Sequence, residues 1–322
     1  MVNIKPQPGI MKIDLYQGGA SQLEGQDEVV KLSSNENPFG PSPQAADAYS
    51  RSGKALHRYP STSHEQLRQA ISRILNLSPE NIICGVGSDE IISLLCQTFS
   101  GKGDEVIYTE HGFAMYKISA LAAGANPVVV KEKNRTTDIN NILKKCNENT
   151  KLIFIANPNN PTGTMITLNE LQELAMKIPK HTLLVLDGAY AEYVDNYDGG
   201  IQLAKNTGNI IITRTFSKIY GLGGMRVGWG FGSKPIIEAL QRVRGPFNLS
   251  VPALAVAEAA INDQDYVEKC KEENNATRDW LIERLRKLGL ACDSSFTNFV
   301  LPRFKNQSQA ELCDNIFSLK VL

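Results

Sequence analysis

The sequence predicts an α/β protein in which a mostly parallel sheet carries helices on both faces. Short β-branched runs alternate with amphipathic helical segments from Ile82 to about Ser217. Polar and glycine-rich clusters directly follow several of these runs. Of the 322 residues, 42% are hydrophobic and 21% are charged, which is ordinary for a globular protein with a substantial core.

The charge and cysteine content argue against several classes of protein. With 34 basic and 34 acidic residues, the chain has no basic excess that would favour a nucleic-acid partner. Its six cysteines form no CxxC pair, which favours reduced thiols over a disulfide framework. The N-terminal stretch lacks the apolar core of a signal peptide, and no apolar run is long enough to span a bilayer. We therefore expect a cytoplasmic protein of enzyme size, without a membrane partner.

The N-terminal part of the chain predicts loops followed by one helix. Residues 1 to about 60 are rich in Pro, Gly, Ser and Asn, which indicates an arm and loops. Apolar residues at helical spacing predict a helix over 63–76. Ser63 and Gln66 have the spacing of a capping box at its start.

The middle of the chain alternates between strands and helices. Strands are expected at 81–87, 104–110, 126–132, 151–158, 182–190 and 209–217. Helices are expected at 88–100, 114–125, 139–148 and 168–178. Because parallel strands need crossover connections, this alternation indicates a parallel sheet. Ligands of such sheets bind at the carboxyl ends of the strands.

The C-terminal part again favours helices. A helix pair is expected at 250–263 and 265–289, followed by a strand at 299–304 and a helix at 308–318. The last elements indicate the start of a second, smaller domain.

Four polar clusters follow expected strands of the sheet. They are GVGSDE at 85–90, NPNNPTG at 157–163, LDGAY at 186–190 and TFSK at 215–218. Because parallel strands end at one edge of a sheet, the clusters are expected to converge on one crevice. That convergence indicates a binding site.

Each cluster taken alone also has a plain structural interpretation. Ser88 or Asp89 can cap a helix, and the Asn-Pro steps can simply form a turn. Asp187 can be a solvated acid at a strand end. Lys218 and Arg226 can be surface residues beside a glycine-rich bend.

Taken together, the clusters suit pyridoxal phosphate (PLP) as a cofactor. Lys218 can form a Schiff base with its aldehyde and then shuttle a proton, and Asp187 can pair with its protonated ring nitrogen. Asn160 and Tyr190 can hydrogen-bond its phenolic oxygen. Phe113, otherwise a core phenylalanine, can stack on the ring. The residues expected around the phosphate are Ser88, Asp89, Thr215, Ser217 and Arg226.

These motifs resemble those of the fold-type I, class I and II aminotransferases. The resemblance is carried by the four clusters and by the arginine eight residues after Lys218. It covers nearly the whole chain, from about residue 8. A narrower resemblance, to histidinol-phosphate aminotransferases, is carried by further stretches, which are LSSNENPFGPSP, HRYPSTSHEQLRQAI, GVGSDEIISLL, HGFAMYKISALAAGA and RGPFNLSVPALAVAEAAI.

The resemblance implies a fold, a partner and a reaction. The fold is a large PLP-binding domain over 41–265, with a mostly parallel seven-stranded sheet. A smaller α/β domain follows at 266–322, and residues 1–40 form an arm and part of that domain. The same site roles are implied, and Tyr59 would reach the cofactor phosphate of the other subunit of a homodimer. The reaction is amino transfer between histidinol phosphate and 2-oxoglutarate in histidine biosynthesis.

The chain departs from the family pattern at two places. Gly188 replaces a glutamate that usually follows the acid, which could loosen that turn with a small effect. Family members also continue for some tens of residues, so the small domain is expected to be incomplete. The resemblance places a substrate-binding arginine in that further part, and no arginine follows Arg303 here.

Other functions share the same cofactor motifs. An aromatic amino acid aminotransferase or a threonine-phosphate decarboxylase would carry the same site. Substrate choice would then depend on the loop from Asn35 to Gly40 and on the C-terminal part. A truncated, non-catalytic PLP-binding protein is an alternative of another class.

Overall fold

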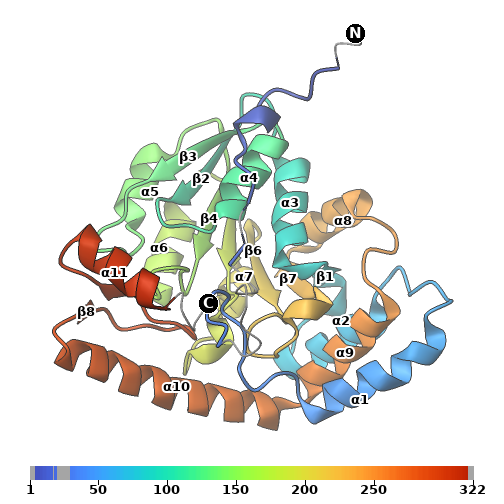
Figure 1. Cartoon of the computed structure of the whole chain (residues 1–322). Helices are drawn as coiled ribbons and strands as arrows, with labels where there is room; N and C mark the ends of the chain where they lie inside the picture. Colours follow the sequence, from blue (N-terminus) through green and yellow to red (C-terminus); the bar gives the residue numbers. More distant parts are fainter. Residues whose placement is uncertain (1–3, 17, 20–29, 318–322) are drawn as a thin grey trace.

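The computed structural model describes residues 4–16, 18–19 and 30–317. Its centre is a seven-stranded sheet with the strand order β1-β7-β6-β5-β4-β2-β3 (Figure 1). The strands are β1 (Ile82–Gly85), β2 (Glu105–Thr109), β3 (Asn126–Val130), β4 (Thr150–Ala156), β5 (Leu183–Asp187), β6 (Ile210–Thr215) and β7 (Gly228–Gly232). The predicted α/β class and mostly parallel sheet are confirmed.

Strand β7 is reversed relative to the other six strands of this sheet. It pairs antiparallel with both β1 and β6, so these two strands point the same way. From β6 outward, β5, β4, β2 and β3 are all paired in parallel. The carboxyl ends of six strands therefore lie along one edge.

The interpretation of the glycine-rich segment as a bend is wrong for Gly228–Gly232, which form a buried strand. Its glycines are needed because neighbouring backbone comes very close. A Cβ on Gly228 would lie 2.4 Å from the Ser88 nitrogen, and one on Gly230 would lie 3.1 Å from the Ile212 oxygen. Close packing therefore replaces the β-branched pattern by which strands are usually recognised.

Helices cover both faces of the sheet. Strand side chains alternate between two hydrophobic clusters, with Ile210 and Ile212 in one and Ile211 in the other. One face is covered by α3 (Gly87–Phe99), α4 (Ala114–Ala122) and α8 (Lys234–Val243). The helices that contribute to the opposite cluster are α1 (Pro43–Ser52), α2 (Glu65–Leu75), α5 (Ile139–Lys145), α6 (Leu168–Lys177), α7 (Ile201–Asn206), α9 (Val251–Asn262) and α10 (Gln264–Lys287).

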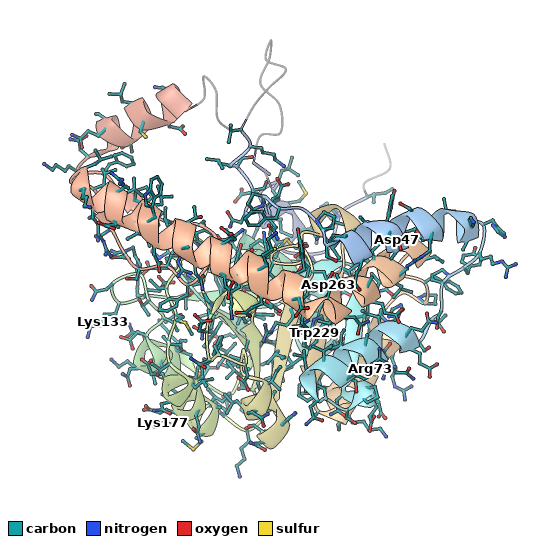
Figure 2. The ribbon with its side chains drawn as sticks, turned by 90° about the horizontal axis from the view of Figure 1, so that it is seen from below. Asp47, Arg73, Lys133, Lys177, Trp229 and Asp263 are labelled. Atoms are coloured by element: carbon teal, nitrogen blue, oxygen red, sulfur yellow. The ribbon has the colours of Figure 1, made fainter. Side chains whose placement is uncertain are left out.

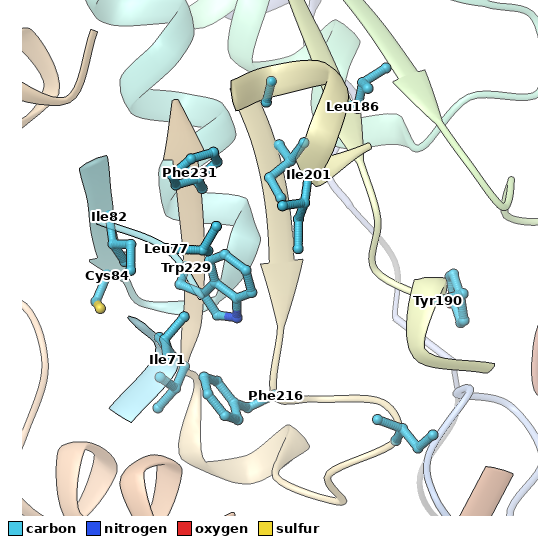
Figure 3. Close-up of a cluster of buried hydrophobic side chains, with 14 of the residues drawn as sticks. Ile71, Leu77, Ile82, Cys84, Leu186, Tyr190, Ile201, Phe216, Trp229 and Phe231 are labelled. Carbon is cyan, nitrogen blue, oxygen red and sulfur yellow. The ribbon is translucent and has the colours of Figure 1, made fainter. Parts of the chain in front are cut away.

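The larger cluster includes side chains of strands β1 and β7. Phe231 pairs in register with Ile82, and Trp229 pairs with Cys84. Figure 3 shows these four side chains together with other members of the cluster. Trp229 is only 1% exposed, so the core extends to the strand that carries Arg226 at its start.

The C-terminal elements lie on the outside of the sheet domain. Helix α10 begins beside Asp263 and crosses the molecule (Figures 1 and 2). The expected strand at 299–304 is shorter than predicted, since only β9 (Pro302–Arg303) pairs, with β8 (Ala291–Cys292). Helix α11 (Gln307–Phe317) follows. The division into domains stays a prediction.

The predicted capping box at the start of α2 is wrong. The helix begins at Glu65, and its N-cap residue is His64, which has a left-handed backbone and makes no side-chain cap bond. The Ser63 hydroxyl instead lies 3.0 Å from the Ser61 hydroxyl. His64 is 1% exposed, so its burial, and not a serine cap, marks this helix start.

None of the helices in the described ranges combines the length and the apolar character that crossing a membrane requires.

Candidate active site

The four polar clusters lie at the common edge where the parallel strands end. Asp187 is the last residue of β5, and Thr215 is the last residue of β6. The Asn160 amide, which follows β4, donates to the Tyr190 hydroxyl over 3.1 Å. Arg226, just before β7, pairs with Asp89 on α3 over 2.9 Å. Hydrogen bonds and ion pairs thus connect segments that are distant in the sequence.

Asp187 is a buried carboxylate with three hydrogen-bond donors. It is 4% exposed. Its Oδ1 accepts from the Thr213 hydroxyl and the Ala189 backbone N–H, each at 3.2 Å. Its Oδ2 accepts from the Tyr116 hydroxyl at 2.7 Å. Burial raises the pKa of Asp187, whereas the bonds from Tyr116 and Thr213 act to lower it.

Tyr190 presents its hydroxyl to two amides. Asn160 and Asn35 both donate to it, at 3.1 Å and 2.9 Å. With two donors on its oxygen, the hydroxyl proton is free to be donated elsewhere. Burial raises the pKa of Tyr190, so the phenol stays protonated at neutral pH.

Lys218 follows β6 and lies over the Tyr190 ring. Its Nζ is 5.5 Å from the ring centroid. Burial lowers the pKa of Lys218, the Asp89 carboxylate opposes that shift, and the Arg226 charge adds to it. A lowered pKa increases the fraction of the neutral amine, which is the nucleophilic and basic form.

The anion side of the site is the start of helix α3 with Arg226. Ser88 and Asp89 are in the first turn of α3, where backbone N–H groups have no intrahelical acceptor. The Arg226 guanidinium donates to the Ser217 hydroxyl at 3.1 Å and to Asp89 at 2.9 Å. The Thr215 hydroxyl accepts from the Ser217 N–H at 3.1 Å. All five residues expected around a phosphate therefore lie together.

One glycine makes this arrangement possible. Gly87 has φ +73°, and a Cβ there would lie 2.6 Å from Arg226 Nη2. A side chain would therefore be strained and would also displace the guanidinium from the helix start.

Phe113 borders the site from α4, at the N-cap position of that helix. Its ring meets the Tyr116 ring edge to face, with centroids 5.9 Å apart. Phe113 is only partly buried and packs against the hydrophobic cluster that contains Tyr116.

Tyr59 does not join the cluster within one chain. Its ring is 82% exposed and stacks on Phe247, with centroids 4.6 Å apart. Its reach to a second subunit stays a prediction.

Arg214 packs beside the turn at Gly188. The Gly188 N–H donates to the Thr213 carbonyl at 2.9 Å. A Cβ on Gly188 would lie 2.9 Å from Arg214 Nε, so the arginine occupies the space beside the glycine. Arg214 forms a buried pair with Glu192 at 2.9 Å. A buried ion pair therefore supports the turn after Asp187.

Sequence reasoning missed three residues of this site. Tyr116, Thr213 and Asn35 each donate a hydrogen bond to a residue that it did identify. Tyr116 follows Phe113 by three positions and is therefore one helical turn away, which was an available signal. Thr213 lies two positions before Thr215 in the same strand, although its side chain is fully buried. Asn35 begins the loop that was expected to affect substrate choice, but no sequence pattern connects it with Tyr190.

The arrangement offers distinct chemistry at each end. One end holds a buried carboxylate, and the other offers an arginine, hydroxyls and a helix start to an anion. An amine of lowered pKa belongs to the same site. Among the residues that the structure describes, no group of three or more His, Cys, Asp or Glu side chains is placed to hold a metal ion.

Comparisons with known proteins identify the family. The sequence model of "Aminotransferase class I and II" matches residues 27–319. A histidinol-phosphate aminotransferase of a Ruegeria species is 58% identical over 322 residues, which is 100% of this chain and 89% of the relative. That of Dinoroseobacter shibae is 58% identical over 320 residues, covering 99% of this chain and 89% of the relative.

Solved structures agree with the sequence comparisons. The histidinol-phosphate aminotransferase of Sinorhizobium meliloti, in complex with pyridoxal-5'-phosphate, superposes with a TM-score of 0.86 at 29% identity, covering 90% of this chain and 81% of that one. The enzyme of Clostridium acetobutylicum gives a TM-score of 0.84 at 26% identity, covering 91% and 88%. Fold, site and sequence together show that the chain belongs to the class I and II aminotransferase family.

Proposed function

We propose that this protein is a PLP-dependent aminotransferase that moves the amino group of histidinol phosphate to 2-oxoglutarate. The products are imidazole-acetol phosphate and glutamate, and the role is in histidine biosynthesis. The observation that carries the proposal is the meeting of Lys218, Asp187 and Arg226 at one sheet edge. The relatives that are 54–58% identical over nearly the whole chain are histidinol-phosphate aminotransferases, which supports the choice of substrate.

The residues of the site fit PLP group by group. Asp187 offers a carboxylate to the protonated ring nitrogen, and Tyr190 and Asn160 offer donors to the phenolic oxygen. Phe113 offers a partly exposed ring face for stacking. When bound, PLP supplies an electron-withdrawing ring that stabilises negative charge at the substrate α-carbon.

The phosphate end is held by charge and by backbone dipoles. The residues proposed to hold it are Ser88, Asp89, Thr215, Ser217 and Arg226. Ser88 and Asp89 act through the N–H groups at the start of α3, where an anion is favoured. Arg226 makes three hydrogen bonds, to the Ser217 hydroxyl, the Gly223 carbonyl and Asp89, so its guanidinium keeps donors for the phosphate.

Lys218 is proposed to bind the cofactor aldehyde and to move the reacting proton. In its neutral form the Nζ takes the proton from the substrate α-carbon and later returns a proton. Burial lowers the pKa of Lys218, which increases the fraction of that form. Tyr190 holds the amine in place, since Nζ lies over its ring.

The proposal includes a second copy of the chain and small-molecule substrates. Tyr59 is exposed and lies outside its own site, so it is proposed to reach the cofactor phosphate of the other subunit of a homodimer. The proposed location is the cytoplasm, and neither nucleic acid nor a membrane is a proposed partner.

Visible absorption spectroscopy of the purified protein tests this function. PLP is added, the imine band is recorded, and histidinol phosphate is titrated in, with glutamate and phenylalanine as comparison donors. We expect a band that shifts at lower concentrations of histidinol phosphate than of phenylalanine. A band that answers phenylalanine but ignores histidinol phosphate would overturn the substrate. The lack of any band would overturn the cofactor site.

A further inference from the structure

We infer that Tyr116 is a positioning residue that holds the Asp187 carboxylate ionised and aimed at the cofactor ring nitrogen. This inference rests on the proposed function and adds a residue on α4 to it. Tyr116 does not need to touch the cofactor for this role, because it acts through Asp187.

The geometry of the contact is specific. The Tyr116 hydroxyl donates to Asp187 Oδ2 at 2.7 Å, which is the shortest of the three bonds that the carboxylate accepts. A short O–H···O⁻ bond is typical of a charge-assisted contact. Thr213 and the Ala189 N–H occupy Oδ1, so Tyr116 is the protein donor to the other oxygen. One lone pair of the carboxylate then remains for the ring nitrogen.

The Tyr116 ring is fixed by two aromatic neighbours. It stacks on Phe154 of β4 with centroids 4.8 Å apart and an interplanar angle of 10°. Phe113 meets it edge to face, with centroids 5.9 Å apart. Tyr116 is 1% exposed, so its hydroxyl is shielded from bulk water. Ring packing therefore determines where the hydroxyl points.

The burial explains why this position is a tyrosine. A phenylalanine would keep both ring contacts and would place no polar atom in the core. The hydroxyl is costly to bury without a partner, and its partner is the one carboxylate proposed to face the ring nitrogen. The polar atom thus belongs to the site and not to the core.

The hydrogen bond from Tyr116 opposes the effects of burial and of the Asp89 charge on the pKa of Asp187. Asp89 and burial both act to raise the pKa of Asp187, and Tyr116 is the first of the groups that lower it. Lys218 and Tyr190 also face this carboxylate. Loss of the Tyr116 bond therefore raises the pKa of Asp187, and the ionised form is lost at a higher pH.

The test is the pH dependence of PLP affinity in Tyr116→Phe. Both the parent and the variant carry Lys218→Ala, so that no covalent bond contributes to the pH dependence. The PLP dissociation constant is measured by tryptophan fluorescence quenching from about pH 5 to about pH 8. We expect the acid-side loss of affinity to move to higher pH, with binding about tenfold weaker at the acid end.

Two further variants make the outcome decisive. Thr213→Val removes a longer bond to the same carboxylate, and we expect a smaller shift in the same direction. Tyr108→Phe removes a hydroxyl that packs beside the same hydrophobic cluster and has no hydrogen-bond partner among the described residues, and its profile should match the parent. A uniform loss of affinity across the pH range in Tyr116→Phe, or an unshifted profile, overturns the inference alone. Failure of the protein with Lys218 intact to bind PLP overturns the proposed function and this inference with it.

Discussion

The two ends of the site differ in how deeply their charged side chains are buried and how fully the chain itself hydrogen-bonds them. At the ring end, Asp187 is buried and accepts three hydrogen bonds from its own chain. At the anion end, the side chains of Arg226 and Asp89 are 43% and 41% exposed and are paired with each other. The ring end is therefore set before the cofactor arrives, whereas the anion end is held by a partly exposed ion pair. Mutations should separate a chemical role at the first end from a binding role at the second.

The largest effect is expected from Lys218→Ala, which removes the proposed catalytic amine. Activity should fall by up to about 10⁴-fold, because the proton-transfer group is lost. The imine absorption band should also disappear, which spectroscopy of the PLP-treated protein measures. Lys205→Ala is the control, since its Nζ contacts only the Asn76 carbonyl in the described structure. An unchanged band in Lys218→Ala would contradict the assignment.

Asp187→Ala should show the chemical character of the ring end. We expect proton abstraction to slow by about 10²- to 10³-fold, because the ring nitrogen loses its buried partner. The measurement is single-turnover kinetics at saturating PLP. Asp187→Asn keeps the volume and removes the charge, so it should resemble the alanine variant. Full activity in either would remove Asp187 from its role.

Arg226→Ala should show the binding character of the anion end. The PLP dissociation constant should rise by about 10- to 100-fold, since charge-assisted hydrogen bonds to the phosphate are lost. Turnover at saturating PLP should change far less than in Asp187→Ala. Arg51→Ala, which breaks an exposed pair with Asp47, is the matched control. If turnover and affinity fell equally in Arg226→Ala, the contrast between the two ends would not hold.

The smallest effect is expected from Tyr59→Phe. Loss of one neutral hydroxyl at the edge of the anion end should weaken PLP binding by about two- to tenfold. The effect should vanish when the protein is diluted to monomers, because the proposed contact comes from the other subunit. Equilibrium dialysis and sedimentation at matched concentrations measure both. Tyr49→Phe, another exposed tyrosine, should leave the affinity unchanged.

The sequence predicts those parts of the site that follow a strand. Asp187, Thr215 and Lys218 could be found because a buried apolar run ends beside each of them. The Tyr116 bond could not be found in this way, since it joins residues 71 positions apart. The spacing from Phe113 places Tyr116 near the site, but no local pattern pairs it with Asp187 before the sheet is assembled.

Most strands of the fold were predictable because buried apolar runs mark them. The prediction failed for β7, which has no such run. Apolar periodicity marks strands such as β4 and β6, but β7 is a strand of alternating glycines. Its position depends on the backbone of α3 and β6, which local patterns do not contain. The Asn35 bond to Tyr190 likewise depends on where a loop settles.

The hairpin between β6 and β7 has a consequence for cofactor recognition. Thr215 and Gly228 pair across its base, so main-chain bonds close the segment that carries both Lys218 and Arg226. The hairpin thereby limits how far apart the Lys218 amine and the Arg226 guanidinium can lie, because both belong to one short closed loop. On the proposed function, that separation must match the distance between the aldehyde and the phosphate of the cofactor. Inserting a residue into the loop would change the separation of the amine and the guanidinium without altering either group.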